Sequence, residues 1–226
     1  MPSASDARCV IVDLDGPILD GRRRHYECYR QILAEDQCRP LPVETYWAMK
    51  RRGTCVKDQL AATGAEALYD RFKAAWLARI EAPAMLALDE LQPGAADTLK
   101  RWRRFGNVRL VLATLRQRED GVTEQLERFD LAAVWDAVVV CSSARDGANK
   151  ARMVADMIRG TSRDRCMWIG DTEADVQGAR QLGCPVWAVT CGLRDEAFLT
   201  ALSPDHLCES MSQIDLRLDR PAEQRT

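Results

Sequence analysis

The sequence predicts an α/β fold in which a parallel sheet has helices on both faces and is interrupted by an inserted helical domain. Three observations support this prediction: short, nearly continuous apolar runs, amphipathic segments between most of them, and one long stretch with helical periodicity but no strand. Of the 226 residues, 46% are hydrophobic and 29% are charged, which is ordinary globular composition. This length accommodates one large domain or a core with a smaller insertion.

The predicted strands are short apolar runs rich in valine. They lie at residues 9–12, 108–113, 137–141, 166–169 and 186–189. Nearly continuous apolar character is typical of strands that are buried on both faces, as in a parallel sheet. Parallel strands also need long crossover connections, which are usually helices. Helical periodicity predicts these helices at about residues 94–104, 117–129, 150–158 and 173–182.

A long helical stretch follows the first strand and breaks this alternation. Helices are expected at residues 22–35, 43–50, 55–62 and 65–80, and Pro40, Pro42, Gly53 and Gly64 separate them. The turn Leu91-Gln92-Pro93-Gly94 marks the return to the α/β pattern. We therefore expect a helical insertion at residues 21–89 within a core formed by residues 1–20 and 90–226.

Charge and cysteine usage exclude several classes of protein. Lys and Arg total 32 against 34 Asp and Glu, a formal charge of −2, whereas nucleic-acid binders usually carry a marked basic excess. The nine cysteines include no C-x-x-C pair, and several lie in apolar runs, which favours buried, reduced thiols and a cytoplasmic location. We find no signal peptide at the N-terminus and no apolar run long enough to span a membrane. The oligomeric state stays open.

Polar residues follow the predicted strands at the edge of the sheet where doubly wound folds bind ligands. They are Asp13 and Asp15 after the first strand, Thr114 after the second, Lys150 after the third, and Asp171 and Asp175 after the fourth. Carboxylates gathered at one edge repel one another unless a cation balances them, and Mg²⁺ prefers such hard oxygen ligands. A lysine and a hydroxyl beside the metal suit a phosphoryl group. Each residue alone has an ordinary structural explanation, as a cap or a solvated side chain, so the prediction rests on their joint placement.

These segments carry a resemblance to a known family. The run Val10-Ile11-Val12-Asp13-Leu14-Asp15-Gly16-Pro17-Ile18-Leu19-Asp20 resembles the first motif of the haloacid dehalogenase superfamily. Thr114 resembles its second motif, Lys150 its third, and residues 169–175 its fourth, in matching order over almost the whole chain. The helical insertion resembles the α-helical cap of the phosphoglycolate phosphatase and β-phosphoglucomutase-like subgroup. The resemblance implies a Rossmann-like core with an inserted cap.

The resemblance also implies roles for the two acids of the first motif. Asp13 would attack phosphorus and form an aspartyl-phosphate. Asp15 would protonate the leaving oxygen and then activate water. Dehalogenase members of the superfamily lack an acid at the position of Asp15, so its presence favours phosphate chemistry over carbon–halogen cleavage.

The remaining motif residues would bind the metal and the phosphate. The resemblance implies that Mg²⁺ is held by the Asp13 carboxylate, the backbone carbonyl of Asp15 and Asp171, with Asp175 nearby or bound through water. It further implies that Thr114 and Lys150 hold the phosphoryl oxygens, while Gly16 lets the backbone approach closely.

Two residues depart from the family pattern. Pro17 stands where Thr or Val is commoner, and its missing N–H removes one potential donor from the loop. Arg116 lies two residues after Thr114, with Leu115 standing where many relatives have a small polar residue; Arg116 either reaches the site or faces solvent.

Specificity is expected to reside in the cap. His25 resembles a position near the active site of capped relatives, although a histidine on the helix surface beside Tyr26 is an equal interpretation. The segment containing Arg51, Arg52 and Lys57 resembles the cap loop that approaches the substrate, so these side chains are candidate contacts to an anion.

The hypothesis is therefore a Mg²⁺-dependent phosphatase that hydrolyses a small phosphorylated metabolite, with neither nucleic acid nor membrane as a partner. A β-phosphoglucomutase-like phosphomutase shares every core residue and is one alternative. The other is a non-catalytic regulatory protein that retains the fold, against which the intact acids argue. Fold and core motifs do not fix the substrate.

Overall fold

A six-stranded parallel sheet forms the core of the computed structural model, which describes residues 8–141 and 146–216. Its strands are β1 (Arg8–Val12), β4 (Val108–Thr114), β5 (Ala137–Val140), β6 (Cys166–Gly170), β7 (Val186–Val189) and β8 (His206–Cys208). The order β5-β4-β1-β6-β7-β8 means that the chain moves outward from β1 to β5 and then returns to the other side of β1. Such a reversal opens a crevice at the carboxyl ends of β1 and β6.

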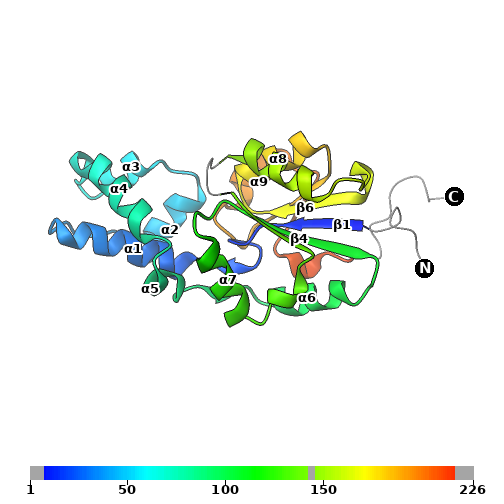
Figure 1. Cartoon of the computed structure of the whole chain (residues 1–226). Helices are drawn as coiled ribbons and strands as arrows, with labels where there is room; N and C mark the ends of the chain where they lie inside the picture. The colour runs from blue at the N-terminus through cyan, green and yellow to red at the C-terminus, as the bar shows by residue number, and fades with distance from the viewer. Residues whose placement is uncertain (1–7, 142–145, 217–226) are drawn as a thin grey trace.

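Helices cover both faces of this sheet, which confirms the predicted α/β fold class (Figure 1). On one face lie α6 (Ala95–Arg103) and α7 (Glu119–Arg128), and on the other α8 (Gly147–Met157) and α9 (Glu173–Leu182). Alternate side chains of β1 enter two separate apolar clusters, with Val10 in the cluster of Trp102 and Ile11 in the cluster of Trp168. Burial on both faces is the physical reason for the continuous apolar runs in the sequence.

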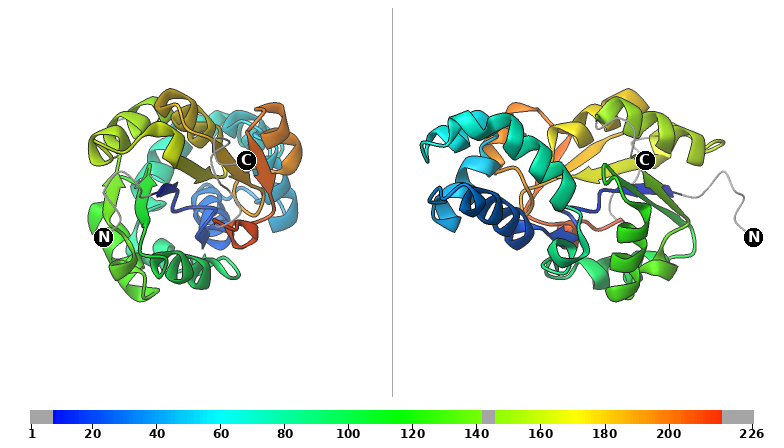
Figure 2. Two further views of the ribbon diagram at one scale, coloured as in Figure 1. Left: turned by 90° about the vertical axis from the view of Figure 1, so that its right-hand side faces the viewer. Right: turned by 60° about the vertical axis from the view of Figure 1, so that its left-hand side comes forward.

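A helical cap occupies the end of the molecule toward which the carboxyl ends of the strands point (Figures 1 and 2). It consists of α1 (Arg22–Glu35), α2 (Val43–Arg51), α3 (Val56–Ala61), a short 3-10 turn at Glu66–Leu68, α4 (Tyr69–Arg79) and α5 (Pro83–Leu86). The cap has an apolar cluster of its own, in which Tyr29 and Tyr46 stack with ring centroids 4.3 Å apart and Phe72 packs against Tyr29. Within the described residues, none of the helices has the length and apolar character that crossing a membrane requires.

The two connections between core and cap pair with each other. β2 (Leu19–Asp20) and β3 (Glu90–Leu91) form a small antiparallel ladder in which Leu19 lies opposite Leu91. The N–H of Gln92 extends this contact by donating to the carbonyl of Ile18 at 2.8 Å. Periodicity in the sequence did not predict these strands, because two residues are too few to show an alternation. The elements β8, α5 and α10 (Glu196–Ala201) are also short, and the sequence did not predict them.

Candidate active site

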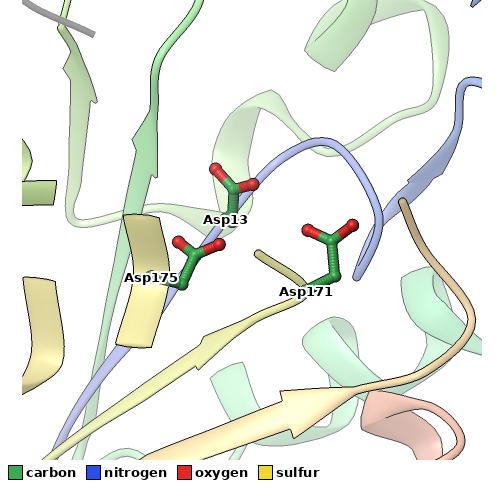
Figure 3. Close-up of side chains that lie close together, drawn as sticks. All are labelled: Asp13, Asp171 and Asp175. Carbon is green, nitrogen blue, oxygen red and sulfur yellow. The ribbon is translucent and has the colours of Figure 1, made fainter. Parts of the chain in front are cut away.

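Three buried carboxyl groups meet at the crevice between β1 and β6 (Figure 3). Asp13 directly follows β1, Asp171 directly follows β6, and Asp175 lies in the first turn of α9. The exposed fractions of these residues are 7%, 1% and 0%, respectively. One oxygen atom from each lies within 4.8 Å of the other two. The reversal of strand order therefore brings together acids that are separated by up to 162 positions in the sequence (175 − 13).

Lys150 supplies the positive charge inside this cluster. Its Nζ atom donates to Asp13 Oδ1 and to Asp175 Oδ1, both at 2.7 Å, and the residue is 1% exposed. Asp175 is itself fixed by Trp168 Nε1 at 3.1 Å and by the Thr172 hydroxyl at 2.7 Å. Its Oδ2 also accepts the backbone N–H of Thr172 at 3.2 Å, as part of the capping box that begins α9. Asp175 thus holds Lys150 against Asp13.

One ammonium group does not balance three buried carboxylates. Burial raises the pKa of Asp13 to about 7 despite the opposing charge of Lys150, and it raises the pKa of Asp171 well above the ordinary value, with Asp13 and Asp175 adding to that rise. Burial opposes the charge on Lys150, but Asp13 and Asp175 outweigh it and raise its pKa. The cluster therefore favours the binding of a further cation.

The geometry of the three acids fits a divalent metal ion. Two ligands of an octahedral Mg²⁺ lie at most roughly 4.2 Å apart, and each of the three acids places one oxygen within 4.8 Å of the other two. Oδ2 of Asp171 accepts the N–H of Leu193 at 2.5 Å, whereas its buried Oδ1 has no hydrogen-bond partner among the described residues. The cluster thus offers hard oxygen donors, one of them unsatisfied.

Two glycines leave room for Asp171. A Cβ atom on Gly16 would lie 2.1 Å from Cγ of Asp171, and one on Gly192 would lie 2.1 Å from its Oδ2. Gly16 also has φ = +96°, a conformation that glycine adopts most readily. Gly16 was expected at the site from the sequence, whereas Gly192 was not, because it follows β7 in a loop without a recognisable pattern.

Thr114 and Pro17 lie on the segments next to Asp13, namely the neighbouring strand β4 and the loop after β1. Thr114 ends β4 and is 1% exposed, and its hydroxyl accepts the N–H of Arg116 at 3.3 Å. The loop containing Pro17 closes through the N–H groups of Gly16 and Leu19, which donate to the carbonyls of Leu19 and Leu14. These hydrogen bonds do not use the donor that proline lacks.

Arg116 reaches the site, which decides between the two interpretations of this residue. Its Nε donates to Asp15 Oδ2 at 2.5 Å and its Nη2 to Asp15 Oδ1 at 2.7 Å. Arg24, from the first turn of α1, donates to the same Oδ1 at 2.6 Å. Burial disfavours the charge on Asp15, but the two guanidinium groups outweigh it and hold the pKa of this carboxyl well below its ordinary value.

A small pocket lies between the acids and the cap. Its volume is about 50 Å³, and its walls include Asp13, Asp171 and, from the cap, Arg24, His25 and Trp47. The ring of His25 also contacts Trp47 and Trp76, with centroids 6.1 and 5.4 Å apart. The pocket holds roughly three or four water molecules, so the seated cap leaves room for a small group only.

The three cationic residues expected to contact substrate lie elsewhere. Arg51 donates through Nη2 to the backbone carbonyl of Thr190, and its own carbonyl accepts the N–H of Asp195 at 3.0 Å. Arg52 is exposed, and Lys57 is exposed with its ammonium 5.0 Å from the ring centroid of Tyr69. The described lining of the pocket includes none of the three, and Arg51 joins the cap to the loop after β7.

Lys50, another cation of the cap, packs against aromatic rings. Its ammonium lies 4.6 Å from the ring centroid of Trp76 and 5.8 Å from that of Tyr46, beside a cavity of about 120 Å³. No carboxylate within residues 8–141 and 146–216 forms a salt bridge with it. Burial lowers the pKa of Lys50 to about 7, and the charge of Arg194 adds to the effect.

Comparisons with known proteins agree with this geometry. A family model described as haloacid dehalogenase-like hydrolase matches residues 7–183. A phosphoglycolate phosphatase from Caulobacter vibrioides is 29% identical over 200 residues, which is 83% of this chain and 81% of the relative. A phosphoglycolate phosphatase from Synechococcus elongatus is 29% identical over 127 residues, covering 55% and 58% of the two chains. The solved structure of a haloacid dehalogenase-like family hydrolase from Streptococcus pneumoniae has the same fold, with a TM-score of 0.73 at 18% identity over 89% of this chain and 93% of that one.

Gly16→Ala should destabilise the chain more than Gly106→Ala does. Both glycines have positive φ, +96° and +71°, but a Cβ on Gly106 meets nothing within 4 Å, whereas one on Gly16 collides with Asp171. Backbone strain of about 1–2 kcal/mol is common to both variants. Chemical denaturation measures the difference, and equal losses of unfolding free energy would show that the contact with Asp171 is not tight.

Lys50→Met should remove part of the pH dependence of stability. The pKa of Lys50 falls from 10.5 to about 7 on folding, so the unfolded chain binds more protons between these values and stability rises with pH across this window. Denaturant unfolding at pH 6.5 and pH 9 should show a smaller rise for Lys50→Met than for the wild type. Lys57→Met, which removes an exposed ammonium from the same cap, serves as the control and should retain the wild-type rise.

Proposed function

Because the chain belongs to the haloacid dehalogenase-like hydrolase family and is a phosphoric monoester hydrolase, we propose that it cleaves a small phosphorylated metabolite through an aspartyl-phosphate, with Mg²⁺ as cofactor. The observation that carries this proposal is the contact between Lys150 and Asp13. The ammonium occupies Oδ1 of Asp13 at 2.7 Å and leaves Oδ2 as the nucleophile.

The donor set supports Mg²⁺ at this site. Asp13 and Asp171 would hold the ion together with the backbone carbonyl of Asp15, and Asp175 lies nearby with its oxygens bonded to Lys150, Trp168 and Thr172. When bound, the ion would offset the negative charge between the nucleophile and the phosphate. Lys150 and the Thr114 hydroxyl would bind phosphoryl oxygens.

The reaction would proceed in two steps. In the first, Oδ2 of Asp13 forms a bond to phosphorus, the ester bond breaks, and the leaving oxygen takes a proton from the carboxyl group of Asp15. In the second, water forms a bond to phosphorus, its proton passes to Asp15, and the bond to Asp13 breaks to release phosphate. Arg24 and Arg116 stabilise Asp15 as a carboxylate, which suits proton acceptance from water more directly than donation to the leaving oxygen.

The size of the pocket bears on the substrate. At about 50 Å³, the space under the seated cap accommodates a phosphoryl group with a short organic part. The two relatives named phosphoglycolate phosphatase suggest phosphoglycolate, a two-carbon phosphate ester, as the first substrate to assay.

Asp13→Asn should lower the release of phosphate from phosphoglycolate and from p-nitrophenyl phosphate by at least about 1000-fold, the scale expected when a covalent nucleophile is lost. Asp97→Asn changes an exposed acid on α6 and should retain full turnover. Release of inorganic phosphate is the measurement. Full Mg²⁺-dependent turnover by Asp13→Asn would refute the assignment of the nucleophile. When glucose 1-phosphate is supplied instead, its conversion to the 6-phosphate without free phosphate would indicate a mutase.

Removal of Mg²⁺ with EDTA should abolish turnover, and Asp171→Asn should raise the Mg²⁺ concentration for half-maximal activity by at least about 10-fold. A readout without substrate is thermal unfolding, because an ion that binds only the folded chain raises Tm. We expect Mg²⁺ to raise Tm of the wild type and to leave that of Asp171→Asn nearly unchanged. The same increase in both would place the metal elsewhere.

A further inference from the structure

A buried ion network links Asp15 to both connections of the cap. The network consists of Asp15, Arg24, Asp89 and Arg116. Arg24 and Arg116 are 2% and 4% exposed and Asp89 is fully buried, whereas the side chain of Asp15, at 33%, retains access to the pocket. Two arginines thus balance two acids. The roles assigned above give Arg24 and Arg116 only a charge effect on Asp15 and give Asp89 none.

Three hydrogen bonds fix the orientation of Asp15. The fork of Arg116 spans both carboxylate oxygens, and Arg24 adds a second donor to Oδ1. A bidentate arginine–carboxylate pair fixes direction as well as distance, because the guanidinium group is planar and its donors are rigidly spaced. Rotation of the Asp15 carboxyl group would break at least one of these bonds.

Asp89 in turn holds both arginines. Its oxygens lie 2.9 Å from Arg24 Nε and 3.2 Å from Arg116 Nη2, and Gln125 of α7 donates to Oδ2 at 2.7 Å. Burial in this position requires partners, because an unpaired carboxylate inside a protein is strongly destabilising. Asp89 is therefore an anchor that sets where the two guanidinium groups lie.

The network also spans the boundary between core and cap. Arg24 is the third residue of α1, directly after β2, and Asp89 precedes β3, whereas Arg116 belongs to the core loop after β4. All hydrogen bonds to Asp15 therefore form only when the start of α1, the segment before β3 and the loop after β4 pack against one another.

We propose that Arg116 and Arg24 are positioning residues that hold the carboxylate of Asp15 toward the attacking water, with Asp89 as their anchor. This inference rests on the proposed phosphatase function. It concerns the second step, in which the oxygen of water bonds to phosphorus, its proton moves to Asp15 and the bond from phosphorus to Asp13 breaks. Loss of either guanidinium should slow this step.

The substrate p-nitrophenyl phosphate separates the two steps. Its leaving group departs as p-nitrophenolate, which needs no proton, so transfer of the phosphoryl group to Asp13 proceeds without Asp15. Hydrolysis of the aspartyl-phosphate still requires a positioned base. A defect in positioning should therefore make the aspartyl-phosphate accumulate, whereas a general structural defect lowers both steps.

The test is rapid mixing of Arg116→Met and Arg24→Met with p-nitrophenyl phosphate and Mg²⁺. We expect a burst of p-nitrophenol close to one equivalent per enzyme, followed by steady turnover about 10- to 100-fold below the wild type, since general base catalysis contributes about 100- to 10,000-fold. Arg116→Lys retains the charge but not the fork and should recover part of the steady rate.

Two matched controls remove an exposed neighbouring arginine. Arg118→Met lies two residues beyond Arg116 and pairs with Asp120 at the surface, and Arg23→Met precedes Arg24 and pairs with exposed Glu90. Both should behave as the wild type. The rise of Tm on adding Mg²⁺ reports whether each variant retains the folded acidic site.

The outcomes separate the two hypotheses. A steady rate of Arg116→Met equal to that of the wild type would overturn the positioning role. So would a slow rate without a burst in a variant whose Tm still rises with Mg²⁺, or a burst that appears equally in Arg118→Met. Absence of Mg²⁺-dependent turnover in the wild type itself would instead contradict the proposed function.

Discussion

The site depends on one electrostatic constraint, the burial of like charges where two parallel strands end side by side. β1 and β6 are neighbours, so the residues that follow them, Asp13 and Asp171, are forced together. Among the described residues, Lys150 is the cation that pairs with this cluster, and Asp175 fixes its position. The ammonium offsets part of the charge of this cluster but leaves an excess of negative charge. The same imbalance that raises the pKa of Asp13 and Asp171 favours the binding of a further cation.

The sequence was informative for the acids that follow β1 and β6 and uninformative for side chains that act across the fold. Apolar runs predicted the strands, and the acids after them could be placed at one edge by topology alone. Arg24 could not be distinguished, because it stands in a run of three arginines of which Arg23 is exposed and Arg24 is buried. Asp89 lies in a connection without periodicity, and nothing in the sequence pairs it with Arg116. Such contacts arise from packing, not from local pattern.

The cap residues that line the pocket differ from the basic residues that the sequence suggested as substrate contacts. Its conspicuous basic residues, Arg51, Arg52 and Lys57, either bind the core backbone or face solvent. The cap side chains that reach the pocket are instead Arg24, His25 and Trp47. The rings of His25 and Trp47 line the pocket beside the acids, while the guanidinium of Arg24 is directed at Asp15. Shape and access are therefore set by the first two helices of the cap.

The ladder between β2 and β3 has a consequence for how such chains change over time. Leu19 lies opposite Leu91 in an antiparallel ladder, so the chain leaves and re-enters the core at one place. The cap is therefore connected to the core in the same way as the loop of a β-hairpin is connected to its two strands. The entropy of closing a loop grows only with the logarithm of its length, so a longer or shorter cap costs the core little. Exchange of the entire insertion is then a local event, because the α/β core keeps its register while the inserted helices are free to diverge.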